Sequence, residues 1–347
     1  MPTAIFNDQR RNELEAMRQH GVAAFSSSTH RDTSIAKLRD RDRPDADEGG
    51  FWIAGRITRL NETSNYLFAD ITDRTGTIQL FADTSAVDIP ELKYLRIGDV
   101  VEATGPIIET DSGETSVNLS DLRFLSKALR HVSFDESLST SRQRADRTRA
   151  LLTSDLQDVL ETRFEITRVI RSRLDEWGYD EVTTPVIQST HSGGSSRPFV
   201  VTPEVDGRRF LRATMEIEMK SLIAGGYDRV FQVGQIFRNE GIDRANHPIK
   251  SVLELYETFA DYDDMMDLTE RLLRVVFDAV DLGPAFEYDG TPVDTSAEWP
   301  RLPIDLATER YGDVEVSGAA DDELLDIATE RSPDDRVFES SGGALYH

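Results

Sequence analysis

Two apolar runs near the middle of the chain carry charged residues of the kinds that bind phosphates and amines. Arg238 and Glu240 follow the first run, and Glu254 lies among apolar neighbours in the second, within FRNEGIDRANHPIKSVLELY at 237–256. Arginine offers a planar fork for phosphate or carboxylate, and a glutamate can bind an ammonium group. The combination suits a substrate with both a phosphate and an amino group. Taken alone, it equally describes a ladder of surface ion pairs.

The elements that hold these residues follow from apolar periodicity. The runs 229–237 and 251–259 alternate and are separated by a polar loop, which predicts a long antiparallel hairpin. Facing side chains in such a pair lie about 5 Å apart, so one face can converge on a ligand. The preceding segment, 179–187, is expected to be a strand interrupted by Pro185.

Three longer segments have helical periodicity. They are 7–20, ended by Gly21; 160–178, with an apolar face and a final glycine; and 265–280, which is strongly apolar. The apolar face of the second comprises Phe164, Val169, Ile170, Leu174 and Trp177. A further helical piece is expected at 33–43.

Between the first helices and the hairpin, the apolar period changes to two. Five short alternating segments with glycine turns occupy 50–128, which predicts a small closed β-barrel of the OB type. A fragment of a β-sandwich is the alternative. Residues 129–155 are charged and lack periodicity, so we expect a linker. The predicted fold class is α+β.

Length and composition limit the class of protein. A chain of 347 residues and 39.0 kDa can form two domains with separate cores. No run approaches the roughly 20 apolar residues that a bilayer span needs, and the start has no signal-peptide pattern. There is no cysteine for a disulfide, thiolate metal site or nucleophile. We therefore expect a cytoplasmic protein without a membrane partner.

The net charge of −25 argues against a nucleic-acid binder by the usual rule, since phosphate contacts favour a basic face. The acidic residues are dispersed, however, and only five of the 39 basic residues are lysine. This pattern is typical of a halophilic protein, because at 1 M salt the Debye length is only about 3 Å. An ordinary acidic protein is the alternative. The charge therefore does not exclude an RNA partner.

FRNEG at 237–241, followed by LELYETFADYDDMMDLTE at 253–270, resembles motif 2 of the class II aminoacyl-tRNA synthetases, specifically the lysyl branch. The resemblance extends over nearly the whole chain. Segment 9–22 resembles the helical extension, 55–81 and 121–130 the OB-type anticodon domain, and 178–188 motif 1. It implies a helical extension at 1–49, an anticodon-binding-like barrel at 50–128, and an incomplete class II antiparallel sheet with flanking helices at 156–347.

The resemblance also implies roles for individual residues of the catalytic-like domain. Arg238 matches the arginine that binds the ATP α-phosphate and the amino-acid carboxylate, and it would stabilise charge during adenylate formation. Glu240 would hold the adenine end of ATP. Glu216 matches the acid that receives the substrate α-amino group, with Gly193 or Gly194 beside it. Glu254 and Tyr256 match the pair near the lysine ε-ammonium.

Three residues of the barrel match anticodon-binding positions, and one residue of motif 1 matches the dimer interface. Phe68 corresponds to the aromatic residue that stacks on an anticodon base. Gln79 and Asp121 correspond to positions that read base edges, with glutamate usual at the latter. For Phe68 and Gln79 the alternative is a half-buried strand residue without such a role. Pro185 corresponds to the proline at the family's dimer interface, so we expect a homodimer.

Two departures from the family pattern concern catalysis. In the motif 2 loop, Ala245 replaces the usual arginine, Lys250 replaces the phenylalanine that stacks on adenine, and MEIEMK replaces the usual Pro-Glu-Leu around Glu216. After Asp281, no segment has the form of motif 3 or of the late magnesium-binding glutamates. The resemblance implies ATP and Mg²⁺ as cofactors, but no Mg²⁺ ligand is identified.

Three functions are consistent with these residues. The first is a lysyl-tRNA synthetase, complete or shortened, with lysine and tRNA as partners and no DNA partner. The second is a catalytically impaired paralogue that binds tRNA or an amino acid. The third is a ligase that attaches lysine to a protein, against which the anticodon-type barrel argues. We expect that the 347 residues alone do not support lysine-dependent ATP–pyrophosphate exchange.

Overall fold

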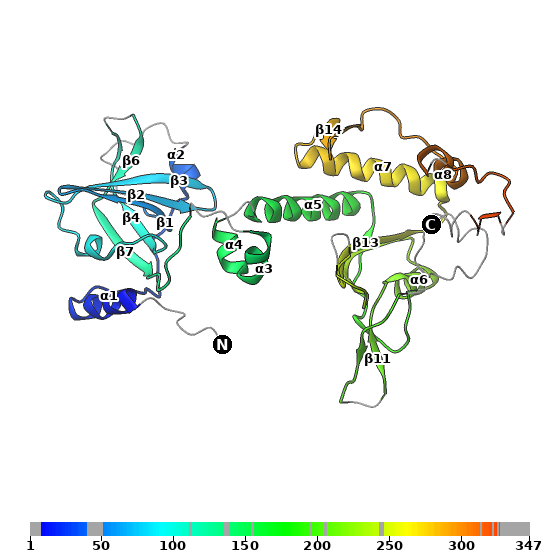
Figure 1. The fold of residues 1–347 in the computed structure, drawn as a ribbon, viewed down its shortest axis with the longest axis horizontal. Coiled ribbons are helices and arrows are strands. Elements are labelled where there is room, and N and C mark those ends of the chain that lie inside the picture. Colours follow the sequence, from blue (N-terminus) through cyan, green and yellow to red (C-terminus); the bar gives the residue numbers. More distant parts are fainter. Residues whose placement is uncertain are drawn as a thin grey trace. The chain divides into compact units, whose positions relative to one another are not determined.

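The computed structural model describes residues 8–39, 51–110, 113–134, 139–153, 156–193, 196–204, 207–242, 246–312, 314–320, 323–324 and 326. The chain divides into two compact units, Met1–Val159 and Leu160–His347 (Figure 1). The division falls four residues beyond the predicted boundary at 155/156.

The first unit is a β-barrel. Its strands are β1 (Ile53–Glu62), β2 (Tyr66–Asp73), β3 (Gly76–Asp83), β4 (Val100–Thr104), β5 (Ile107–Glu109), β6 (Thr115–Asn118) and β7 (Asp121–Ser126). Their order in the sheet is β5-β6-β3-β2-β1-β4-β7. Because β4 runs into β5 and β6 into β7 after two residues each, the two ends of this order are one bent hairpin. Five chain segments therefore close the barrel, as predicted.

Glycine is required at the break between β4 and β5. Gly105 has a positive φ of 158°, and a Cβ there would lie 1.9 Å from the carbonyl oxygen of Asn118. This close approach of two backbones lets the strand bend and change partners.

The barrel interior follows the alternation of the strands. Leu67, Ala69 and Ile71 of β2 point inward, while the residues between them face outward. Two helices contribute to the same core: α1 (Asp8–Gln19), which ends before Gly21, and α2 (Ile35–Arg39). Part of the second predicted helix, residues 40–43, lies outside the described residues.

The predicted linker contains regular structure that its pattern did not indicate. Two short helices, α3 (Thr140–Ala145) and α4 (Arg147–Thr153), lie within it. Asp146 accepts a hydrogen bond from the backbone N–H of Arg149 at 3.1 Å, which satisfies a free donor at the start of α4. Arginine, alanine and leucine, which are frequent in α3 and α4, have high intrinsic helix propensity, so these helices of one or two turns form without a periodic apolar face.

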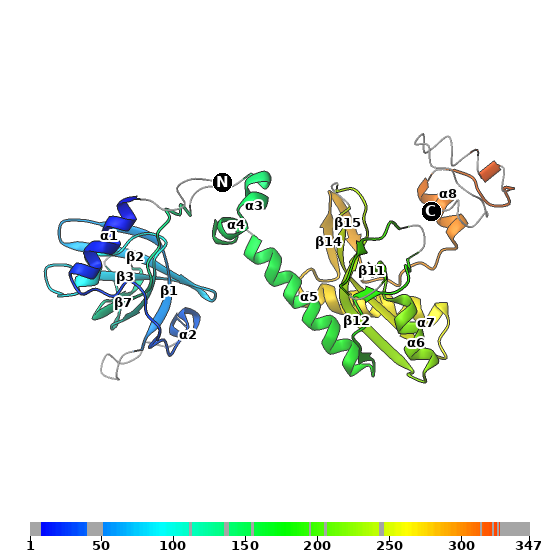
Figure 2. The same cartoon turned by 90° about the horizontal axis from the view of Figure 1, so that it is seen from below.

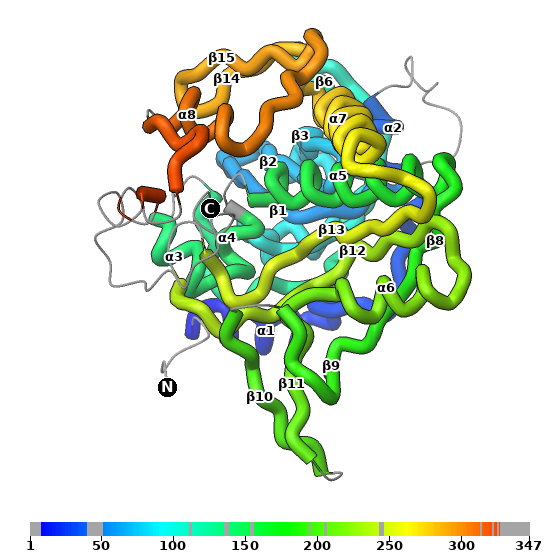
Figure 3. The backbone as a smooth tube through the Cα atoms, turned by 90° about the vertical axis from the view of Figure 1, so that its right-hand side faces the viewer, coloured from blue at the N-terminus to red at the C-terminus, as the bar shows by residue number. Residues whose placement is uncertain are grey.

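The second unit is built on the predicted hairpin. β12 (Arg229–Phe237) and β13 (Ile249–Glu257) pair antiparallel from Arg229↔Glu257 to Phe237↔Ile249, which confirms the prediction. β8 (Asp180–Glu181) pairs parallel to β12, so this sheet is mixed. Figure 3 shows α5 (Leu156–Glu176) and α6 (Glu216–Ala224) on opposite sides of the β12–β13 pair.

The two faces of the hairpin pack against different helices. Phe231, Leu253 and Leu255 pack with α5 and with α7 (Tyr262–Ala279), which confirms both predicted apolar helices. On the other face, Val230 and Ile236 pack with α6. Phe164 differs from its prediction, because its side chain is 57% exposed rather than part of the packed face.

The strand predicted at 179–187 is interrupted around Pro185, as expected, and the break extends from residue 182 to residue 186. β8 ends at Glu181, and β9 (Ile187–Gln188) belongs to a second small sheet with β10 (Val200–Val201) and β11 (Arg209–Leu211). Between them, the Gln232 side chain accepts hydrogen bonds from the backbone N–H and the hydroxyl of Thr184. These bonds replace ladder bonds where Pro185 has no N–H to donate.

Three further elements of the second unit follow α7. They are the hairpin β14 (Ala285–Tyr288) and β15 (Thr291–Asp294), and helix α8 (Ile304–Gly312) (Figure 2). Sequence patterning predicted none of these three. A 3₁₀ helix, Pro90–Tyr94, connects β3 to β4 in the first unit.

Candidate functional site

The segment from Arg212 to Glu216 links the predicted substrate-binding residues. It connects β11 to α6 and is largely buried. The Arg212 guanidinium donates to the carbonyl oxygens of Gln235 and Thr184 at 2.8 and 3.0 Å. Burial lowers the pKa of Arg212, and the charge of Glu254 opposes that shift. Sequence reasoning missed this buried cation beside the predicted lysine-binding acid.

Glu254 opens onto a cleft. The cleft has a volume of about 550 Å³, and Glu216, Glu254 and Tyr256 all contribute to its lining. The remaining wall is mainly leucine, with Leu253 and Leu255 from β13 and Leu268, Leu272 and Leu273 from α7. An apolar wall beside carboxylates suits a ligand with an aliphatic chain and an amine at its end.

Tyr256 adds a hydroxyl to this cleft. Burial, and then the negative charges of Glu254 and Glu216, raise the pKa of Tyr256 to about 12. The phenol therefore remains protonated and keeps both donor and acceptor capacity at neutral pH. Three of the four residues that were predicted to bind the amino acid, Glu216, Glu254 and Tyr256, thus line one cleft, and Gly193 is not among its lining residues.

Glu216 is the first residue of α6, and Gly193 lies near the preceding segment. The Glu216 carboxylate contacts the Lys220 ammonium at 2.5 Å, one helical turn further on. Gly193 has a positive φ of 129°, and a Cβ there would lie 2.7 Å from the Cβ of Ala213. Gly193 is thus a close-approach glycine, while Gly194 lies outside the described residues.

Arg238 and Glu240 follow β12 at the end of the hairpin. The Arg238 side chain donates from Nε to the Ala213 carbonyl at 3.4 Å, so it reaches the same central segment. Glu240 contacts the Lys250 ammonium at 3.6 Å, and both side chains are about one third exposed. The residue that replaces the adenine-stacking aromatic therefore pairs with the acid predicted to hold adenine. Ala245 lies outside the described residues.

The residues present fit part of the implied cofactor set. Arg238 places a positive charge beside the segment from Arg212 to Glu216, and a nucleotide phosphate requires such a charge. In the described part of the chain, no three His, Asp or Glu side chains gather closely enough to hold a metal ion. No Mg²⁺ ligand is therefore identified among the described residues.

On the barrel, the outward faces of β2 and β3 carry a group of aromatic rings. Phe68 and Phe81 are paired across the two strands, with ring centroids 5.2 Å apart. Tyr66 stacks on Phe81 with centroids 5.8 Å apart. Gln79 lies on the same face, where its amide donates to Glu114 and accepts from the Ser116 hydroxyl, both at 2.9 Å. A base that reads Gln79 must therefore displace one of these contacts.

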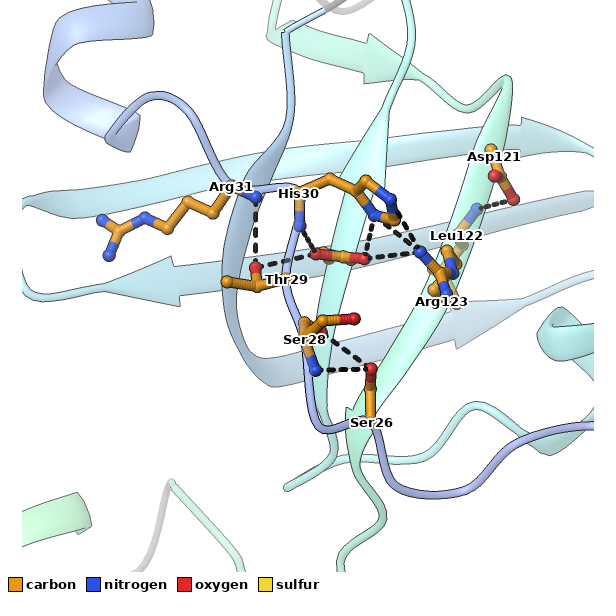
Figure 4. Close-up of polar contacts among 9 residues, drawn as sticks. Ser26, Ser28, Thr29, His30, Arg31, Asp121, Leu122 and Arg123 are labelled. Carbon is orange, nitrogen blue, oxygen red and sulfur yellow. Dashed lines mark hydrogen bonds and ion pairs between the residues drawn. The ribbon is translucent and has the colours of Figure 1, made fainter.

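Asp121 begins β7, the strand that pairs with β4. Its carboxylate accepts the Leu122 backbone N–H at 2.8 Å and is exposed. Close by, Arg123 and His30 both contact Glu102, whose side chain is fully buried (Figure 4). The Thr29 hydroxyl also donates to Glu102, so the segment before α2 is fastened to β4 and β7. In Figure 4, the Asp121 carboxylate is bonded to the Leu122 backbone and is not among the groups that contact Glu102.

Comparison with known proteins agrees with this architecture. Residues 51–125 match the family of OB-fold nucleic acid binding domains, and residues 139–338 match the class II tRNA synthetases of the D, K and N group. The chain belongs to this synthetase family, which confirms the resemblance to the class II synthetases found in the sequence.

Among curated proteins, the chain is similar to several lysine–tRNA ligases. It is 32% identical over 330 residues to that of Thermoanaerobacter sp. (strain X514), covering 92% of this chain and 66% of the relative. The lysine–tRNA ligase of Clostridium botulinum (strain Hall) is 30% identical over 334 residues, with 93% and 66% covered. The chain thus spans about two thirds of the length of these relatives.

Proposed function

We propose that this protein is a lysyl-tRNA synthetase-like protein that binds lysine in the cleft beside Glu254 and binds lysine-type tRNA through the barrel. In the family reaction, lysine is activated with ATP and transferred to tRNA. The observation that carries the proposal is the convergence of Glu216, Glu254 and Tyr256 on a leucine-lined cleft. A lysine side chain matches this lining, because it has a four-carbon stem and a terminal ammonium.

The barrel supports the tRNA part of the proposal. Phe68 and Gln79 share one outward face of β2 and β3, with Phe81 beside them. Aromatic rings on an open β surface stack on unpaired bases, and base–aromatic stacking tolerates an acidic protein because it is not a charge interaction. Asp121 would read a base edge from β7.

Lysine binding is tested by isothermal titration calorimetry with lysine and with norleucine. Norleucine has a neutral, unbranched side chain in place of the ammonium-bearing one. We expect binding of lysine and weaker binding of norleucine by the unsubstituted chain. In Glu254→Gln, the preference for lysine should be lost while norleucine binding is retained. Equal affinities for the two ligands in the unsubstituted chain would contradict the proposal.

The ion pair between Lys250 and Glu240 favours a second candidate, a paralogue impaired in adenylate formation. An ammonium at this position neutralises the acid proposed for adenine and offers no stacking surface for a purine. The test is lysine-dependent ATP–pyrophosphate exchange by the native chain and by Lys250→Phe. A gain of exchange in Lys250→Phe supports the impaired paralogue, and ready exchange by the native chain contradicts it.

We also propose a homodimer formed through α5 and the segment around Pro185. Four apolar side chains near these elements are exposed in the single chain: Val159 and Phe164 on α5, and Val186 and Ile187 after Pro185. Exposed apolar groups of this kind are typical of an interface between subunits. Light scattering at micromolar concentration in high salt should give the mass of a dimer, and a monomer would contradict the proposal.

Because tRNA and ATP are cytoplasmic substrates, we propose that the protein acts in the cytoplasm. Within the residues that the structure describes, no helix is long and apolar enough to cross a membrane.

A further inference from the structure

One hydroxyl connects Glu254 of the proposed amino-acid site to the backbone at the start of α6. The Thr214 hydroxyl lies 3.1 Å from Oε1 and 3.4 Å from Oε2 of Glu254. The same oxygen accepts the backbone N–H of Glu216 at 3.1 Å. Thr214 is about nine-tenths buried and lines the cleft, so water does not easily replace these contacts.

The Met215 backbone N–H reinforces the same arrangement. It donates to Oε1 of Glu254 at 3.1 Å. Oε1 thus receives both short hydrogen bonds, while among the residues that the structure describes Oε2 has the longer contact to Thr214 at 3.4 Å. A carboxylate held by one oxygen keeps its orientation and leaves lone pairs of the other oxygen for a ligand.

The same hydroxyl connects Glu254 on β13 to the backbone at the start of α6. Its contact with Glu216 is with the backbone N–H, while the Glu216 carboxylate contacts Lys220. The carboxylate that Thr214 orients is therefore that of Glu254, and small errors in such positioning weaken recognition of a ligand.

We propose that Thr214 is a positioning residue that selects a cationic amino-acid side chain. Its hydroxyl holds Glu254 so that Oε2 faces the ammonium of the ligand side chain. This inference rests on the proposed lysine site.

The test compares lysine and norleucine binding to Thr214→Val, which keeps the side-chain shape and removes the hydroxyl. Calorimetry should show lysine binding about tenfold weaker, the effect expected for losing a hydrogen bond to a charged group. Norleucine affinity should change less than about twofold, because the hydroxyl acts through the carboxylate that norleucine does not use. Thr214→Ser restores the hydroxyl and should restore the preference for lysine.

Thr258→Val is the matched control. Its hydroxyl donates to Asp228, just beyond the end of β13, so this change should alter neither affinity. Circular dichroism and thermal unfolding establish that each variant is folded, and Thr214→Ala replaces Thr214→Val if the latter does not fold.

Equal losses of lysine and norleucine binding in Thr214→Val would show a merely structural role and overturn the inference. Unchanged lysine binding in Thr214→Val would overturn it as well. If the unsubstituted chain binds no lysine, both this inference and the proposed lysine site are wrong. Preserved lysine binding in the unsubstituted chain with no effect at Thr214 refutes the inference alone.

Discussion

Replacing Phe68 by alanine should weaken tRNA binding by removing a stacking surface. Phe68 lies on the outward face of β2, where its ring packs at a tilt against Phe81 with centroids 5.2 Å apart. One side of the ring is supported by Phe81, and the side chain is half-buried. The residue is thus held in place before RNA arrives, which lowers the entropy cost of stacking.

The size of the effect follows from this geometry. Stacking of one base on an aromatic ring contributes about 1–3 kcal/mol. Because Phe68 is half-buried, only part of its ring is open to a base, and we take the lower part of that range. A loss of about 1–2 kcal/mol corresponds to a 5- to 30-fold increase in Kd.

The assay is fluorescence anisotropy with labelled lysine-type tRNA at one fixed salt concentration, since affinity for RNA depends strongly on salt. Phe25→Ala is the control, because Phe25 is a 51% exposed aromatic residue of the same unit that bridges to Ser126 rather than lying on β2 or β3. Thermal unfolding of both variants separates binding from stability. If Phe68→Ala binds as tightly as the unsubstituted protein, or no more weakly than Phe25→Ala, base stacking at this position is refuted.

Three further substitutions test the structure. Lys127→Met should lower the free energy of unfolding by about 3–5 kcal/mol, because it leaves the buried Asp99 carboxylate without its ammonium partner at 2.8 Å. Urea denaturation measures this loss, and a loss below about 1 kcal/mol would count against the prediction. Gly193→Ala should lower the free energy of unfolding by about 1–3 kcal/mol, since a φ of 129° is strained for alanine and the new Cβ would lie 2.7 Å from the Cβ of Ala213. An unchanged melting temperature would contradict this prediction. Burial raises the pKa of Glu102, but hydrogen bonds from His30, Thr29 and Arg123 outweigh burial and hold the pKa below its usual value of 4.5. The Glu102 carboxylate therefore contributes stability at neutral pH, and this contribution is lost as the pH falls below that value. His30→Ala should lower stability at pH 7 and flatten the acid dependence in urea titrations, and an unaltered dependence would contradict the contact.

Local patterns were sufficient to predict the barrel and the hairpin. Strict alternation and glycine turns specify strands to within a few residues. Two such runs separated by a polar loop were sufficient to predict the antiparallel pair, whose nine residue pairs run from Arg229↔Glu257 to Phe237↔Ile249. The interruption predicted at Pro185 in the strand 179–187 is confirmed, but the first part ends earlier, at Glu181, and Gln232, some 50 residues away, takes the hydrogen bonds of Thr184. Sequence spacing contains no signal for such a distant partner.

The same limit applies to the candidate site. The resemblance indicated Glu254 and Tyr256, and the structure brings them into one cleft with Glu216. It did not indicate Thr214, whose contact with Glu254 joins residues 40 positions apart. It placed Lys250 where the family has an adenine-stacking phenylalanine but did not indicate the ion pair of Lys250 with Glu240, which depends on the turn between β12 and β13.

The most direct test of the account is whether the protein distinguishes the lysine anticodon. Competition binding should compare a tRNA anticodon stem-loop bearing UUU with the same stem-loop bearing GUC. We expect the UUU form to compete at least about tenfold better, since each unsatisfied polar contact at a base edge costs about 1–3 kcal/mol. The Gln79→Ala variant should lose most of this preference. Equal competition by the two stem-loops would contradict the proposal that this barrel binds lysine-type tRNA.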